Sequence, residues 1–185
     1  AWATSMHSKV IRIDVSAESD ITVVAGMARS GKSAWVKRQI ERRPSVFAWD
    51  PDGEYVLAGI TRPIYRRFDF LRAVLDKRPG RFSYIAPISR AEFNFWALAV
   101  LHRGDCTAVA EETADVTHAG KAPEQWGQLV RKGAKRRISL FAVTQTPPES
   151  DKTVMRNARR IVCFMQDREP DIDYMAREMR VPRDE

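Results

Sequence analysis

The chain has little of what disulfide-stapled or membrane-spanning proteins are built from. Its 185 residues include two cysteines, Cys106 and Cys163, each inside an apolar run and without a CxxC or Cys/His cluster around it. This usage favours buried free thiols in a reducing compartment over a disulfide or a zinc site. No apolar run approaches the roughly 18 residues that a spanning helix needs, and no signal peptide opens the chain. We therefore expect a protein that neither spans a membrane nor is exported.

The chain contains only 9 glycines, has 10 prolines, and shows no internal repeat, low-complexity tract or linker. Because a chain of 185 residues with 44% apolar side chains can bury one sizeable core, residues 1–185 are expected to form a single domain. Residues 1–5 precede Met6 and are either a cloning remnant or a processed start. The net charge of +7 favours contact with polyanions, although an ordinary basic protein shows the same balance.

Apolar patterning predicts short strands that alternate with helices. Residues 9–15 alternate like an edge strand, whereas residues 21–26 are continuously apolar, as a strand covered on both faces must be, and are expected to form the central strand. Further strands are predicted at 45–50, 62–69, 81–86, 106–111, 138–145 and 159–166. Helical patterns lie at 32–42, 69–78, 89–103, 122–134 and 171–180. The alternation indicates an α/β fold with a mostly parallel central sheet flanked by helices and a ligand site at the carboxyl ends of its strands.

The most specific motif is the loop that follows residues 21–26. Residues 26–33, GMARSGKS, match the P-loop spacing G-x-x-x-x-G-K-S, between a buried strand and a helix. Gly26 and Gly31 let the backbone turn tightly, so that the N–H groups of the loop, including that of Ser30, point at the β-phosphate of a nucleotide. The sequence therefore predicts a nucleotide-binding loop.

Two residues at the end of this loop define the expected ligand. Lys32 would place its ammonium between the β- and γ-phosphates of ATP, and Ser33 would ligate Mg²⁺. The plain alternative is a structural glycine turn followed by a surface lysine. Asp50 lies about 20 residues further on, as in dinucleotide-binding folds, but G-x-G-x-x-G is absent, so a Rossmann cofactor site is set aside.

Polar residues end two later strands. In P-loop enzymes the first acidic residue after such a strand takes Mg²⁺ through water and the second polarises the attacking water, so Glu111 and Glu112 fit these two roles. Glu111 stands where aspartate is usual. Gln145, at the end of the next strand, would hydrogen-bond the γ-phosphate or the lytic water. Solvated glutamates and a capping glutamine are the plain alternatives.

Residues 131–137, RKGAKRR, carry five cations in seven positions. Such a run is most often a solvated face, but it also suits an arginine that reaches a neighbouring subunit's nucleotide and neutralises charge in the transition state.

Four motifs together resemble a known superfamily. Residues 47–55, FAWDPDGEY, are similar to the D-P-x-G-E-Y signature of the HerA branch of the HerA/FtsK superfamily of DNA-pumping ATPases. The P-loop, the stretch AVAEE at 108–112 and the stretch ISLFAVTQTPP at 138–148 follow in the order expected of that superfamily. The resemblance implies a RecA-like core that works as a ring, usually a hexamer, and threads double-stranded DNA through its pore as ATP is hydrolysed between subunits.

By this resemblance, Lys32 and Ser33 bind the phosphates and Mg²⁺, Glu111 and Glu112 form the acidic pair, and Gln145 is the sensor. Two positions depart from the pattern: Thr146 replaces the usual arginine, and Ala134 falls where an arginine is common. The trans-acting arginine therefore has three candidates. They are Arg131, the lead choice from its place in the preceding helix, Lys135 and Arg136.

The small size narrows the resemblance to the minimal ATPases that pump the genome into the capsid of viruses with an internal membrane. Such a motor implies double-stranded DNA, a homo-oligomeric ring and capsid vertex proteins as partners, ATP and Mg²⁺ as cofactors, and a location in the host cytoplasm or at the virion vertex. Because a motor of this type grips phosphates, basic loops are the candidates for DNA contact. These are Arg62, Arg66, Arg67, Lys135, Arg136 and Arg137.

Three other function classes fit parts of the pattern. A small P-loop nucleotide kinase or a nucleotide-dependent switch would share the P-loop, but would leave the D-P-x-G-E-Y stretch and the Thr-Gln strand without a role. A DNA-binding or assembly protein with a vestigial P-loop would not need the acidic pair. A filamentous-phage export ATPase would be expected to carry a membrane segment.

Overall fold

The computed structural model describes residues 20–120 and 122–181. They build a seven-stranded sheet with the order β3-β4-β2-β5-β6-β1-β7, in which every pairing is parallel. The strands are β1 (Ile21–Ala25), β2 (Val46–Trp49), β3 (Arg62–Ile64), β4 (Arg81–Tyr84), β5 (Cys106–Ala110), β6 (Ile138–Thr144) and β7 (Arg160–Cys163). The predicted parallel α/β fold is confirmed. The strand predicted at 9–15 lies outside the described residues.

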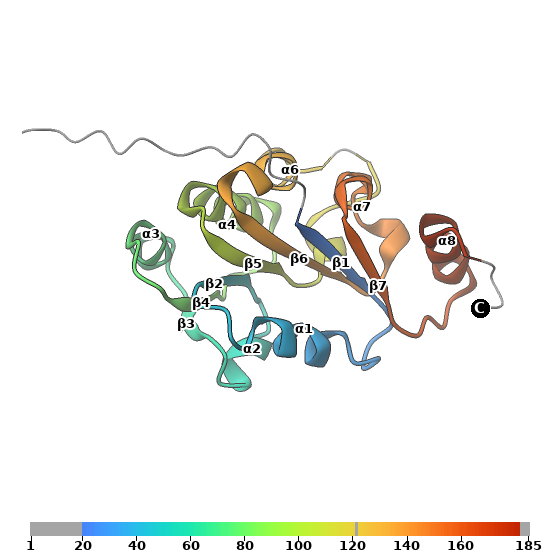
Figure 1. Ribbon diagram of the computed structural model, residues 1–185, viewed down its shortest axis with the longest axis horizontal. Helices are drawn as coiled ribbons and strands as arrows, with labels where there is room; N and C mark the ends of the chain where they lie inside the picture. The colour runs from blue at the N-terminus through green and yellow to red at the C-terminus, as the bar shows by residue number, and fades with distance from the viewer. Residues whose placement is uncertain (1–19, 121, 182–185) are drawn as a thin grey trace, which may run out of the picture.

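Helices cover both faces of this sheet (Figure 1). α1 and α2 lie on one face, α3, α4, α6 and α7 lie on the other, and α8 follows β7 at one end. Their bounds are α1 (Lys32–Ile40), α2 (Glu54–Leu57), α3 (Arg67–Leu75), α4 (Arg90–Arg103), α5 (Thr113–Val116), α6 (Glu124–Lys132), α7 (Lys152–Asn157) and α8 (Glu169–Met179). Short 3₁₀ turns occupy Ala134–Arg136 and Pro147–Glu149. Across the described ranges, none of the helices has the length and apolar character needed to span a bilayer.

The double coverage explains why several strands are apolar without interruption. On the α1 face, Val36 and Ile40 pack against Val24 of β1, Val109 of β5 and other strand side chains. On the opposite face, a larger cluster contains the fully buried aromatic rings of α4 and α6. The rings of Phe93, Trp96 and Trp126 lie with centroids between 5.0 and 6.4 Å apart. These aromatic contacts fix α4 and α6 as one layer.

Two predictions of strand position are wrong. β1 is covered on both faces, as expected, but it lies second from the β7 edge, and β5 holds the middle of the seven described strands. A continuously apolar strand is one that is covered on both faces of the sheet, and this holds for both β1 and β5. It does not show where in the sheet the strand lies. The strand expected at 62–69 ends at Ile64, because α3 already begins at Arg67.

The two cysteines differ in exposure. Cys106 is buried in β5, and burial raises the pKa of its thiol to about 12, so the thiol stays protonated. Cys163 is exposed at the end of β7, so the expectation that both thiols are buried is wrong. β7 is the outermost described strand on its side, and its side chains are correspondingly less covered than those of β1.

A buried carboxylate joins α6 to α7 and to the segment after β6. The Asp151 side chain accepts the N–H groups of Thr153 and Val154, at 2.9 and 3.3 Å, and so caps α7. Its second oxygen accepts the indole N–H of Trp126 at 2.6 Å. Asp151 is fully buried, so competition from water for its oxygens is limited.

The substitution Asp151→Ala is expected to lower the free energy of unfolding by about 2–4 kcal/mol, because it removes a helix cap and leaves a buried indole N–H unpaired. Urea titration followed by circular dichroism measures this change. In a Trp126→Phe background the cost of Asp151→Ala should fall by about 1–2 kcal/mol, since the unpaired donor is gone. Equal costs in both backgrounds would contradict the role given to the indole bond.

Candidate functional site

The polar residues predicted from three separate strands meet at one edge of the sheet. All strands are parallel, so the P-loop after β1, the acidic pair after β5 and Gln145 after β6 follow carboxyl ends that lie together. The Gln145 amide Nε2 donates to Glu112 Oε1 at 2.6 Å. The carboxylates of Glu112 and Glu111 both act electrostatically on Lys32. The structure thus brings the predicted nucleotide-binding and acidic residues into one cluster.

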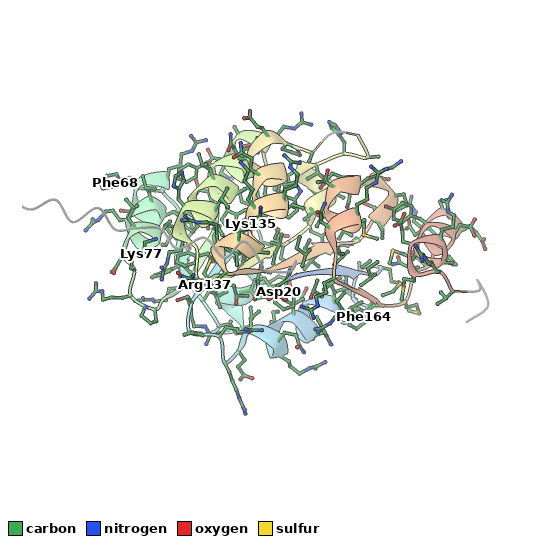
Figure 2. The ribbon with its side chains drawn as sticks, turned by 45° about the horizontal axis from the view of Figure 1, so that its top comes forward. Asp20, Phe68, Lys77, Lys135, Arg137 and Phe164 are labelled. Carbon is green, nitrogen blue, oxygen red and sulfur yellow. The ribbon has the colours of Figure 1, made fainter. Side chains whose placement is uncertain are left out.

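The backbone of the P-loop requires its glycines. A Cβ atom at Gly26 would stand 2.6 Å from Cβ of Phe164 and 2.7 Å from Oγ of Ser30, too close for any side chain. Gly31 has a φ of 103°, a left-handed conformation that glycine adopts without strain. Phe164, the residue after β7, lies against this loop, and Figure 2 labels it. The Met27 N–H also donates to Met165 O at 2.9 Å, so the segment after β7 supports the loop.

Lys32 is buried and folded back over the loop. Its ammonium donates to Gly26 O at 2.7 Å and to Met27 O at 2.8 Å, and the residue is 5% exposed. Burial lowers the pKa of this lysine, and the nearby carboxylates of Glu112 and Glu111 oppose that shift. An ammonium held by two neutral carbonyl oxygens is poorly compensated, so phosphate oxygens would be stronger partners for it.

Other atoms of the loop fit a phosphate and a magnesium ion. Ser30 Oγ is buried and finds no hydrogen-bond partner among the described residues. In the same described part of the chain, the N–H groups of Lys32 and Ser33, in the first turn of α1, meet no acceptor. Such N–H groups at a helix N-terminus suit an anion. The hydroxyl of Ser33 and the carboxylate of Glu111 are oxygen ligands of the kind that Mg²⁺ prefers.

Glu111 is held by a residue whose role the sequence did not reveal. The Tyr55 hydroxyl donates to Glu111 Oε1, and both side chains are buried. Burial raises the pKa of Glu111 to about 8, although the hydrogen bond from Tyr55 opposes this shift. Burial also raises the pKa of Tyr55 well above its ordinary value, so the phenol remains a donor.

The D-P-D-G-E-Y stretch acquires a structural explanation from this bond. Asp50 accepts the N–H groups of Glu54 and Tyr55, at 2.8 and 3.1 Å, and the Ser83 hydroxyl at 2.8 Å. These bonds fix the first turn of α2, which carries Tyr55 toward Glu111. Tyr55, the last residue of the stretch, could have been singled out from the sequence. Only the parallel pairing of β2 with β5 shows that it lies against Glu111.

Glu112 adopts an unusual backbone conformation. Its φ of 44° and ψ of 58° lie in the left-handed region, which is uncommon for a residue with a side chain. Strain of this kind persists where the surrounding structure imposes it and is concentrated at functional sites. Burial raises the pKa of the Glu112 carboxyl, opposed by the Gln145 hydrogen bond and by Lys32. The bend turns the second acid of the pair toward Gln145 rather than along the strand direction.

The basic candidates for DNA contact do not form one surface. Arg62, Arg66 and Arg67 lie in and after β3, so the last two lie at the carboxyl edge of the sheet. Lys135, Arg136 and Arg137 precede β6 and therefore lie at the amino edge, and Figure 2 shows Lys135 and Arg137 near Asp20, the residue before β1. The two groups are therefore separated by the length of the strands.

Several of these cations already have partners within the chain. Arg67 forms an ion pair with Glu92 at 2.9 Å, and Arg137 contacts both oxygens of Asp105. The Arg62 guanidinium lies 4.8 Å from the ring centroid of Phe82, and Arg136 donates to His102 O at 2.8 Å. Lys135 and Arg66 are exposed, with no side-chain contact that the structure shows among the described residues.

Arg131, the lead candidate for a trans-acting arginine, lies over a glycine of its own helix. A Cβ atom at Gly127 would stand 3.0 Å from Arg131 Nη1 and 3.2 Å from Nη2. The absence of a side chain at Gly127 therefore makes room for the guanidinium. None of the salt bridges among the described residues involves Arg131. α6 lies on the face of the sheet opposite α1, the helix that follows the P-loop (Figure 1).

No protein-family model matches the chain. Protein P9 of Pseudoalteromonas phage PM2 is 33% identical over 167 residues, which cover 86% of this chain and 75% of that protein. The chain belongs to the family of Protein P9. The P-loop, the acidic pair and Gln145 are thus found in a member of the P9 family. This family agrees with the resemblance, noted from the sequence, to the ATPases of viruses with an internal membrane.

Solved structures similar to this P9-family chain share its fold. The genome packaging NTPase B204 of Sulfolobus turreted icosahedral virus 2, in complex with ATP-gammaS, superposes with a TM-score of 0.71 at 16% identity, over 86% of this chain and 82% of that one. The N-terminal domain of zonular occludens toxin from Neisseria meningitidis gives a TM-score of 0.52 at 15% identity, over 80% and 77% of the two chains. The expected P-loop NTPase fold is confirmed.

The raised pKa of Glu111 predicts a pH-dependent stability. In the unfolded chain this carboxyl ionises near its ordinary pKa of 4.5, whereas in the folded chain it keeps its proton to about pH 8. As the pH rises between these values the unfolded state is favoured, so the wild-type protein should lose stability relative to Glu111→Gln, by on the order of 3 kcal/mol. Urea titrations of both proteins at pH 5.5 and pH 8, without nucleotide or Mg²⁺, measure this difference.

Glu41→Gln, at an exposed position just after α1, is the matched control, and its stability relative to wild type should stay constant between the two pH values. A constant difference for Glu111→Gln as well would mean that Glu111 is ionised in the folded protein.

Proposed function

We propose that the chain is an ATPase that translocates double-stranded DNA, acting as the genome-packaging motor of a virus. The observation that carries the proposal is the cluster at the carboxyl edge of the sheet, where a P-loop lysine, two glutamates and a glutamine from three parallel strands converge. A nucleotide-binding site alone needs only the P-loop. The acidic pair and Gln145 supply what hydrolysis requires in addition.

Each residue has a distinct part in this proposal. Lys32 and the loop N–H groups, with Gly26, Ser30 and Gly31, bind the phosphates. Ser33 and Glu111 hold Mg²⁺, which bridges phosphate oxygens and neutralises charge that develops on them.

Glu112 polarises the attacking water. Its bond to Gln145 supports the sensor role, because a glutamine that contacts the general base is placed to respond when a γ-phosphate enters. Tyr55 positions Glu111 and contacts no substrate atom.

Assembly completes the site. We propose a homo-oligomeric ring, a hexamer by the sequence resemblance, in which Arg131 of one subunit approaches the nucleotide of the next, with Lys135 and Arg136 as the alternatives. Arg136 is the weaker of these, because it already donates to His102 O. The exposed cations Arg66 and Lys135 are the better supported of the six proposed DNA contacts. The capsid vertex is the proposed docking partner, and the host cytoplasm or the virion vertex the proposed location.

Lys32→Ala should abolish nucleotide binding, because the loop loses its only ammonium. Glu112→Gln should bind nucleotide like wild type and lower turnover by about 100-fold or more, since the amide cannot accept the proton of water. Binding is measured with a fluorescent ATP analogue and turnover by phosphate release. Equal loss of binding in both variants would contradict the division of roles.

Steady-state ATP hydrolysis should rise with linear double-stranded DNA and with protein concentration, because a site completed by a neighbour's arginine is slow in a monomer. The measurement is phosphate release with and without DNA, at low and moderate salt, across concentrations that span assembly. Stimulation should weaken steeply with salt, since phosphates are the contacts. Turnover that is indifferent to DNA and to concentration, or that depends on a small acceptor, would instead indicate a kinase or a switch.

A further inference from the structure

A cavity of about 770 Å³ lies on the helical face of the molecule, away from the P-loop. It opens between the start of α4, the loop from α5 to α6, and the outer side of α6. Its lining includes Arg90, Asn94, His118, Glu124, Arg131 and Lys132. None of the residues proposed to hold the chain's own ATP or Mg²⁺ lines it, whereas Arg131, proposed to act on a neighbour's nucleotide, does. The chain's own nucleotide site and this cavity are therefore separate.

The walls of the cavity are fixed by hydrogen bonds that are buried or partly buried. Asn94 Oδ1 on α4 accepts the N–H groups of Gln125 and Trp126, at 3.1 and 3.3 Å, and so caps α6. The Trp126 indole donates in turn to Asp151, at the start of α7. The neighbouring lining residue Thr153 donates its N–H to the same Asp151. A cavity whose three helices are tied to one another does not need a ligand to form.

The cavity carries more positive charge than negative charge. Three cations, Arg90, Arg131 and Lys132, face one carboxylate, Glu124. No salt bridge or side-chain hydrogen bond of these three cations appears within the described part of the chain. By contrast, Arg67 and Arg137 are held by carboxylates elsewhere on the surface. Three cations with a single counter-charge repel one another, so this arrangement favours an anion between them.

The lining also indicates the kind of anion. Apart from the imidazole of His118, it contains no aromatic ring on which a base could stack, and it contains no glycine-rich loop to surround a triphosphate. Arg90 begins α4 and Lys132 ends α6, so the cavity receives positive charge from two helices and not from a single loop. Contacts of this type read charge and spacing and not base sequence.

We propose that this cavity binds the phosphate backbone of double-stranded DNA through Arg90 and Lys132, at a site distinct from the basic loops considered above. The proposal rests on the proposed function, because it assumes that the protein handles DNA. It adds a contact surface on the α4–α6 layer, next to Arg131. DNA held there lies beside the residue proposed to act on the neighbouring nucleotide.

The test compares duplex binding by wild type and by the double variant Arg90→Ala/Lys132→Ala. The probe is a fluorescein-labelled linear duplex of arbitrary sequence, and anisotropy is recorded at several salt concentrations. Loss of two phosphate contacts should lower affinity at least about 10-fold and reduce the slope of log K against log salt by about 2. The control Arg38→Ala/Arg42→Ala removes equal charge from exposed positions on and just after α1, on the other face of the sheet.

Two further readouts separate a local effect from misfolding. The double variant should bind a fluorescent ATP analogue like wild type and unfold at the same urea concentration, because Arg90 and Lys132 are exposed. The swap Arg90→Lys/Lys132→Arg should keep duplex affinity within a few-fold, since backbone contacts depend on charge. A double alanine variant whose salt slope equals that of the control would overturn the proposal and leave the proposed function standing. Absence of duplex binding by wild type in every assembled state would contradict both.

Discussion

The parallel register of three neighbouring strands is the constraint on which the candidate site depends. Ala25 of β1 pairs with Thr144 of β6, and Ala110 of β5 pairs with Ala142 of β6. The residue after each paired end is functional: Gly26 begins the P-loop, Gln145 follows Thr144, and the acidic pair follows Ala110. A shift of one residue in either pairing would turn these side chains to the opposite face of the sheet. The main-chain ladder therefore brings the positions of Gln145 and Glu112 close enough for their side chains to form a hydrogen bond.

Bringing these residues together at the carboxyl edge of the sheet buries several polar groups around the acidic pair, which is unfavourable unless they are hydrogen-bonded. Glu111 and Asp50 are almost fully buried, and burial raises the pKa of both carboxyls. Each is satisfied from the protein side, Glu111 by the Tyr55 hydroxyl and Asp50 by two N–H groups and the Ser83 hydroxyl. A network in which every member has a partner holds a single geometry. By contrast, Ser30 Oγ has no partner among the described residues, and the Lys32 ammonium has only two neutral main-chain carbonyls. The protein thus fixes the acids and leaves the phosphate-facing groups for a ligand.

The sequence predicted the fold and the residues of the site better than it predicted which other residues contact them. Buried strands and a strand-loop-helix P-loop are local patterns, so β1, β5, β6 and the loop at 26–33 were found directly. The place of β1 in the sheet was not, because apolarity measures coverage and not strand order. Tyr55 and Phe164 act across the sheet, on Glu111 and on the P-loop, and such contacts depend on strand order that no local pattern encodes. The sequence named the basic loops at 62–67 and 135–137 as candidates for DNA contact, but it does not show that they occupy opposite edges of the sheet.

Whether a cation already has a partner within the chain is a better guide to DNA contact than how densely cations occur in the sequence. The run at 131–137 is the densest, yet Arg137 pairs with Asp105 and Arg136 contacts a main-chain carbonyl. These contacts would have to break before such residues could bind DNA. The free energy lost in this way offsets part of the binding free energy that a phosphate contact contributes. Arg90, Arg131 and Lys132 carry no such cost. These three cations lie around one cavity beside α6. The positive charge that has no partner within the helical layer is therefore concentrated at this cavity. A polyanion bound there would contact α6, the helix that carries Arg131.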